Sequence, residues 1–128
     1  MSLVSPLGRV LGLGAAGEGV AHWWAQRLSS VALAVLGGWF LVALIRLPDF
    51  AFDTAAQWLR QPLHAVLLLL FVVASCYHSY LGLQVVVEDY VHAVALKVAT
   101  LIALQLAHLF VAALALYAVL KVALGAAP

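Results

Sequence analysis

The residues best suited to chemistry in this chain lie between Phe71 and His92, in a segment that begins apolar and ends in an acidic pair and a tyrosine. His78 stands in the apolar part, where an ionisable side chain is costly and is by default a candidate functional residue. Eleven residues along an α-helix return to within about 20° of the same face. Asp89 is therefore expected on the face of His78, roughly 16 Å further along the axis.

Small residues surround His78 at helical spacing. Ala74 and Ser75 precede it by four and three residues, and Gly82 follows it by four. Such a surface admits a flat, wide group, and a porphyrin whose iron takes histidine as an axial ligand fits that description. A neighbouring helix that packs on small residues would use the same surface, and this alternative stays open.

The other histidines are weaker candidates. His22 and His92 are expected near headgroups or water. His64 lies at the start of its apolar run and is also expected to meet water. His108 lies deep in an apolar run and is expected to be satisfied by an interhelical hydrogen bond. His64 and His78 are fourteen residues apart, about 40° from the same face and roughly 21 Å along a helix, a spacing that two stacked haems would need.

Composition indicates a membrane protein. Of the 128 residues, 67% are hydrophobic and 9% are charged, which is more apolar surface than one soluble domain can bury, so lipid must cover it. The net charge of +1 offers no basis for a nucleic-acid partner. The single cysteine, Cys76, excludes an internal disulfide and cannot build a metal site alone.

Three apolar runs of spanning length predict an all-α integral membrane fold with three transmembrane helices. We expect them at about residues 22–47, 62–88 and 92–122. Because only about five residues connect the second run to the third, these two helices must be antiparallel neighbours.

The predicted organisation is an extramembrane segment at 1–20, a transmembrane anchor domain at 21–124 and a tail at 125–128. Three spans place the two termini on opposite sides of the membrane. Three lysines or arginines fall on each side, so charge does not decide the orientation.

Arg27 follows the pair Trp23–Trp24, which is typical of an interfacial anchor. Its side chain either extends to headgroup phosphates or pairs with a buried anion, for example a haem propionate. Ser30 follows three residues later, on the same side of the helix.

The stretch from His78 to Gln84, followed by Asp89 and Tyr90, resembles the membrane-anchor signature of succinate dehydrogenase, respiratory complex II. The chain is similar to the small hydrophobic membrane-anchor polypeptide of that family. The segment Arg27-Leu28-Ser29-Ser30 resembles the start of that family's first helix. The resemblance covers most of the chain after residue 20, and it implies that the three helices join a hetero-oligomeric bundle.

The resemblance implies a haem site. His78 would be one axial ligand of haem b, and a partner anchor subunit would supply the second. Arg27 would lie near a haem propionate with Ser30 beside it, and Gly82 would leave space for the porphyrin.

The resemblance also implies a quinone site, in which Tyr90 would donate a hydrogen bond to a quinone carbonyl and Asp89 would be a neighbour. A tyrosine hydroxyl can stabilise the negative charge that develops on the carbonyl oxygen. Asp89 and His92 can connect such a pocket to water. We do not expect this chain alone to form a complete active site.

The implied function is that of a non-flavin subunit of succinate:quinone oxidoreductase, which links the tricarboxylic acid cycle to the respiratory chain. Its partners would be a second anchor subunit (cytochrome b), an iron–sulfur subunit and a flavoprotein subunit. FAD and the iron–sulfur clusters would belong to those partners, since one cysteine cannot hold a cluster. The family would place the chain in the bacterial inner membrane with a cytoplasmic N-terminus.

Three alternatives remain at this stage. The chain could anchor a fumarate reductase, which runs in the opposite net direction. It could be a stand-alone cytochrome b with two haems, on His64 and His78. It could also be a structural membrane subunit whose small residues only pack helices.

Overall fold

The computed structural model describes residues 19–125, which form four helices. These are α2 (Gly19–Arg46), α3 (Phe52–Leu59), α4 (Pro62–Tyr90) and α5 (Val94–Ala123). No strand occurs within the described range, and α2, α4 and α5 are each long and apolar enough to cross a membrane. The predicted all-α fold with three spanning helices is confirmed.

The three long helices correspond to the predicted spans. Their ends differ from the expected positions by three residues at most. Residues 1–18 of the predicted N-terminal segment and residues 126–128 of the predicted tail lie outside the described residues. Gly19 and Val20, which the prediction assigned to the extramembrane segment, begin α2.

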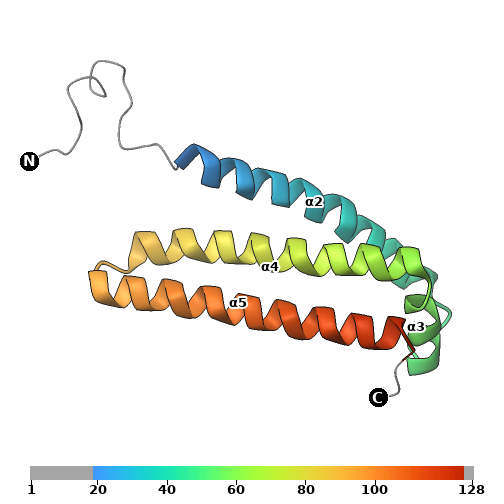
Figure 1. Ribbon diagram of the computed structural model, residues 1–128. Coiled ribbons are helices and arrows are strands. Elements are labelled where there is room, and N and C mark those ends of the chain that lie inside the picture. The colour runs from blue at the N-terminus through green and yellow to red at the C-terminus, as the bar shows by residue number, and fades with distance from the viewer. Residues whose placement is uncertain (1–18, 126–128) are drawn as a thin grey trace, which may run out of the picture.

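The long helices lie side by side in one layer, with α4 in the middle (Figure 1). One side of α4 packs against α2 and the other against α5, whereas the backbones of α2 and α5 do not approach each other. Each long helix runs antiparallel to the next, so α2 begins and α5 ends at opposite ends of the layer (Figure 1). The ends of the described chain therefore have the predicted opposite placement.

A short turn holds α4 and α5 together. α4 ends at Tyr90, and the extended backbone of Val91 leads into α5 at Val94. The ammonium group of Lys97 donates a hydrogen bond of 2.7 Å to the backbone carbonyl of Glu88. Because the last carbonyls of a helix lack intrahelical partners, this bond caps the end of α4.

The helix α3 was not predicted, since its sequence reads as a polar connection. Its buried residues, Ala56 and Leu59, are three apart and so share one helix face. That face packs on the start of α4 and the end of α5, where Leu59 joins a small cluster with Ala65 and Val119. Tertiary packing at the end of the layer therefore decides its structure, because eight residues form no stable helix alone.

Little of the chain is buried within itself. No side chain in the described range is less than 2% exposed, and the buried apolar residues number five. Large apolar side chains such as Ile45, Tyr117 and Val94 are mostly exposed. This surface requires lipid or other protein subunits to cover it.

Candidate functional site

His78 lies at the interface between α2 and α4, where it meets Ser29. The Ser29 hydroxyl oxygen is 2.9 Å from Nδ1 of His78. The same hydroxyl donates its proton to the backbone carbonyl of Gln26 at 3.0 Å. Because a hydroxyl has only one proton, Oγ of Ser29 must accept from Nδ1–H of His78. This arrangement selects the tautomer of His78 that leaves a lone pair on Nε2.

Ser29 is the only buried polar residue in the described part of the chain, at 6% exposure. Water therefore cannot replace its hydrogen bond to His78 easily. The imidazole is held at its Nδ1 by a partner on another helix, and its plane and direction are fixed relative to α2 as well as α4.

The other ring nitrogen of His78 faces the side chain of Gln26. Nε2 of Gln26 lies 3.5 Å from Nε2 of His78, which is long for a hydrogen bond. The carboxamide oxygen of Gln26 is buried and has no hydrogen-bond partner. A Cβ at Gly82 would lie 3.6 Å from Nε2 of Gln26, an ordinary van der Waals distance, so Gly82 lies directly against the carboxamide.

This donor set fits an axial haem ligand. A histidine that binds a metal usually donates its other ring N–H to an acceptor, which fixes the ring and raises its basicity. His78 meets this condition through Ser29, and its Nε2 carries the free lone pair. Iron could bind Nε2 of His78 only if the Gln26 carboxamide moved away. This movement would break no hydrogen bond of the carboxamide oxygen, because that oxygen has no partner. No group of three or more His, Cys, Asp or Glu side chains gathers within residues 19–125, so a purely protein-built metal site is not formed there.

The small residues around His78 do not form one surface. Ala74 lines an apolar groove of about 520 Å³ between α2 and α4, which Ser29 also lines and His78 does not. Ser75 lies towards α5, and its hydroxyl donates to the carbonyl of Phe71 at 2.7 Å. Positions three and four residues before His78 are rotated to opposite sides of it on a helix. Of the three small residues, Gly82 is the one that lies against the Gln26 carboxamide, which in turn faces the imidazole.

Arg27 is exposed on α2. It lies two residues before Ser29, so it points about 160° away from the face that contacts α4. Its guanidinium carbon is 5.4 Å from the centre of the Trp23 ring, a cation–π contact. The neighbouring Ser30 hydroxyl donates to the carbonyl of Gln26 at 2.7 Å. The haem roles of Arg27 and Ser30 remain predictions.

Asp89 and Tyr90 form the last residues of α4 and are both exposed, Tyr90 at 80%. His92 is exposed in the turn that follows. The Lys97 bond to Glu88 fixes the backbone just before them. Their side chains make no hydrogen bond within residues 19–125, so they are available to a ligand or to another chain.

His108 and His64 are hydrogen-bonded within the chain, His108 through both ring nitrogens and His64 through one. Nδ1 of His108 donates to the carbonyl of Leu104 at 2.9 Å, and its Nε2 is 3.2 Å from the Ser79 hydroxyl on α4. The expected interhelical hydrogen bond of His108 is therefore confirmed. Nδ1 of His64 donates to the carbonyl of Trp58 at 2.9 Å.

Sequence reasoning missed the roles of Ser29 and Gln26. Their three-residue spacing places them on one face of α2, but nothing in the sequence gives the register of α2 against α4. Only that register brings Ser29 level with His78.

The fold and the site define a multi-pass α-helical membrane protein with an oriented histidine inside its helix layer. A family model described as succinate dehydrogenase/fumarate reductase transmembrane subunit matches residues 1–122, and the chain belongs to this family.

Relatives in several bacteria agree with this assignment. The chain is 30% identical over 126 residues to the succinate dehydrogenase hydrophobic membrane anchor subunit of Paracoccus denitrificans, covering 98% of this chain and 97% of the relative. The proteins of the same name from Rickettsia bellii and Rickettsia conorii are 32% and 34% identical. Those two alignments each cover 73% of this chain, and 74% and 75% of the respective relatives. No solved structure matches the chain. The resemblance drawn from the His78 and Asp89-Tyr90 motif is confirmed at the level of the family.

Proposed function

We propose that the chain is the membrane-anchor subunit of a succinate:quinone oxidoreductase, that it binds haem b through His78 together with a partner anchor subunit, and that it contributes to the quinone-reduction site. The observation that carries this proposal is the orientation of His78. Its Nδ1 is held by Ser29 and its Nε2 is left with a lone pair, in the middle of a spanning helix.

When bound, haem b supplies a one-electron redox centre within the membrane. The chain's own residues would hold it in place. His78 would provide the Nε2 lone pair, and Ser29 would keep the imidazole from rotating. The Gln26 carboxamide, which lies opposite Gly82, would have to turn aside. Arg27, at the membrane boundary, would neutralise a propionate with help from Ser30.

Quinone reduction needs two electrons and two protons. The Tyr90 hydroxyl would donate a hydrogen bond to a quinone carbonyl and stabilise the negative charge that develops there. Asp89 and His92 would exchange protons between this site and water. Because Tyr90 is 80% exposed here, the other walls of the pocket would come from partner subunits.

The proposed partners are the second anchor subunit (cytochrome b), the iron–sulfur subunit and the flavoprotein, which carries FAD. Membership of the family supports a place among other subunits of this kind. The relatives are bacterial, and the resemblance implies an inner-membrane location with the start of α2 and the Asp89-Tyr90 end on the cytoplasmic side. Since the relatives are named succinate dehydrogenase subunits, we favour succinate oxidation over fumarate reduction as the net direction.

His78→Ala in the purified complex tests the haem assignment, with His108→Ala as the matched control. His108 is also deep, but both its ring nitrogens are bonded within the chain. We expect His78→Ala to abolish the low-spin six-coordinate spectrum and His108→Ala to retain it. The reverse pattern would overturn both the ligand and the family transfer. Two haems per chain would instead support a stand-alone cytochrome that also uses His64, and no haem a purely structural subunit.

A further inference from the structure

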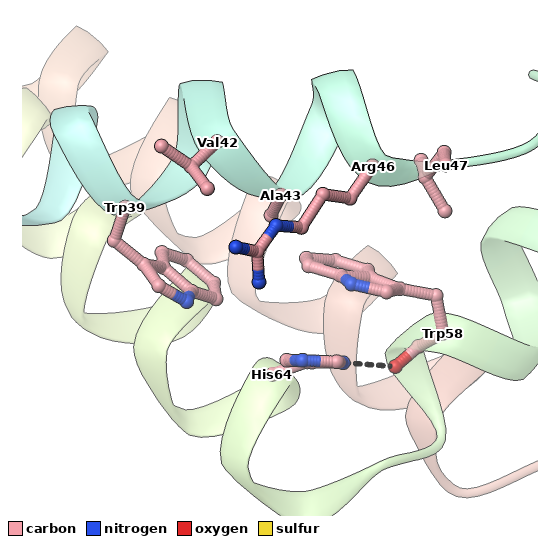
Figure 2. Close-up of a pocket in the computed structure, with 7 residues that line it drawn as sticks. All are labelled: Trp39, Val42, Ala43, Arg46, Leu47, Trp58 and His64. Atoms are coloured by element: carbon pink, nitrogen blue, oxygen red, sulfur yellow. Dashed lines mark hydrogen bonds between the residues drawn. The ribbon is translucent and has the colours of Figure 1, made fainter.

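A pocket of about 310 Å³ lies at the end of the layer away from Asp89 and Tyr90. It forms where α2 ends, α3 crosses and α4 begins (Figures 1 and 2). The residues that line it combine aromatic rings with one cation and one imidazole: Trp39, Val42, Ala43, Arg46, Leu47, Trp58 and His64. Neither the haem site nor the quinone site uses any of them.

Stacked rings build one wall of this pocket. The rings of Trp58 and His64 stack with centres 4.4 Å apart and planes 16° apart. Trp39 stacks on Trp58 with centres 5.8 Å apart. Each ring comes from a different helix, so this stack joins α2, α3 and α4 and gives the wall a fixed shape.

Arg46 supplies the charge. Its guanidinium is turned back into the space between Trp39, Trp58 and His64 (Figure 2). No carboxylate forms an ion pair with Arg46 among the residues that the structure describes. An arginine with free donors in a partly enclosed pocket is suited to a phosphate, which it can bind with two parallel hydrogen bonds.

His64 supplies an acceptor. Its Nδ1 must donate to the carbonyl of Trp58, because a carbonyl oxygen can only accept. In the neutral imidazole, Nε2 therefore carries a lone pair, and no group within residues 19–125 donates to it. The pocket thus offers donors for an anion at Arg46 and an acceptor for a hydroxyl at His64.

The position in the membrane indicates where such a ligand comes from. Arg46 is the last residue of the spanning helix α2, so the pocket lies at the level of lipid headgroups. Val42 lies one turn before Arg46, lines the pocket and is 49% exposed, which gives an acyl chain an apolar path along α2.

The charges at this end also favour an anion. This end of the layer carries three cations, Arg46, Arg60 and Lys121. It also carries two carboxylates, Asp49 and Asp53, so the net charge of the described residues there is +1. The Thr54 hydroxyl and the Ala51 N–H hold the pKa of Asp49 below its usual value, so its negative charge is included in this count.

We propose that this pocket binds an anionic glycerophospholipid with a hydroxyl-bearing headgroup. Its phosphate meets the guanidinium of Arg46, its headgroup hydroxyl donates to Nε2 of His64, and one acyl chain lies along Val42. The site is independent of haem and quinone, and it lies on the opposite membrane face from the Asp89-Tyr90 end.

Native mass spectrometry of the delipidated complex tests the site. The probes are phosphatidylglycerol, phosphatidylcholine with the same acyl chains, and inorganic phosphate. The variant Arg46→Gln is compared with Arg60→Gln, which removes a cation from the same end of the layer but not from the pocket. Haem content reports whether each variant complex is intact.

We expect one strongly retained phosphatidylglycerol per chain in the wild type and in Arg60→Gln, and binding at least about 10-fold weaker in Arg46→Gln. Equal binding by the two variants would overturn the site. Displacement of the lipid by equimolar inorganic phosphate would overturn the assignment to a lipid.

His64→Phe keeps a flat ring against Trp58 and removes the Nε2 acceptor. Phosphatidylcholine has no hydroxyl or N–H to donate, so the wild type should prefer phosphatidylglycerol. His64→Phe should reduce that preference to the part that the net negative charge of phosphatidylglycerol supplies at Arg46. A wild type that binds both lipids equally, or a preference of unchanged size in His64→Phe, would refute the hydroxyl contact.

Discussion

The replacement Ser29→Ala tests whether Ser29 on α2 orients His78 as a haem ligand. It removes one oxygen atom and creates no charge and almost no cavity. The Nδ1–H of His78 then loses its acceptor at 2.9 Å. The carbonyl of Gln26 still accepts from Ser30, so the backbone of α2 keeps a partner.

The magnitude follows from the burial of this hydrogen bond. A net hydrogen bond is worth about 0.5–1.5 kcal/mol, and a buried donor left without a partner costs about 1–3 kcal/mol. Ser29 is 6% exposed, so the higher range applies. At about 1.4 kcal/mol per factor of ten, haem affinity should fall about 5- to 150-fold. This agrees with the roughly 10- to 100-fold cost that is typical of removing a hydrogen-bond partner from a metal ligand.

The assay measures haem loss from the intact complex to an excess of a haem-scavenging apoprotein, together with the midpoint potential. A less basic imidazole stabilises ferric iron less well, so the potential should rise in Ser29→Ala. A change in packing alone gives no reason to expect a higher midpoint potential. Ser29→Thr restores the hydroxyl and should restore both values.

Ser75→Ala is the matched control, because its hydroxyl also donates to a backbone carbonyl of its own helix but makes no hydrogen bond with His78. If Ser29→Ala and Ser75→Ala have the same haem loss rate and the same potential, Ser29 does not orient the ligand, and the tautomer argument fails.

Three further predictions concern the two ends of the site. Tyr90→Phe should lower quinone reduction by roughly 10²–10³ while sparing succinate oxidation by an acceptor that takes electrons before the membrane, and wild-type quinone reduction would remove Tyr90 from the site. Arg27→Gln should weaken haem retention or shift its potential, whereas Arg46→Gln should do neither; if Arg27→Gln also has no effect, Arg27 only contacts headgroups and Trp23. Lys97→Met removes the 2.7 Å bond to Glu88, so amide exchange in the last turn of α4 should accelerate about fivefold for a loss of about 1 kcal/mol, and unchanged exchange would show that the bond does not hold the turn.

Periodicity and length identified the three spanning helices because each run is apolar over its whole length. The same information placed Asp89 on the His78 face and identified His108 as internally bonded. It could not reveal α3, whose helix depends on Leu59 packing against Val119, a residue about sixty positions away. It also could not reveal Ser29 as the partner of His78, because interhelical register depends on side-chain packing across α2 and α4. It also could not show that Ala74 and Ser75 line different grooves, one towards α2 and one towards α5, because this too depends on how the helices pack.

The layered order of the helices has a consequence for how the proposed haem would enter. α4 packs with α5 across one side and with α2 across the other, and α2 and α5 are not in contact. The two interfaces are therefore coupled through α4 and, at the end where α2 finishes, through α3, whose Trp58 stacks on Trp39 of α2. The first half of α2, which carries Gln26 and Ser29, could swing away while the α4–α5 hairpin remained intact. Such an opening would remove both Ser29 and Gln26 from His78 at once and expose the imidazole to an incoming porphyrin. Return of α2 would then lock the coordinated ring, so haem loading and closure of the layer would be a single event during biogenesis.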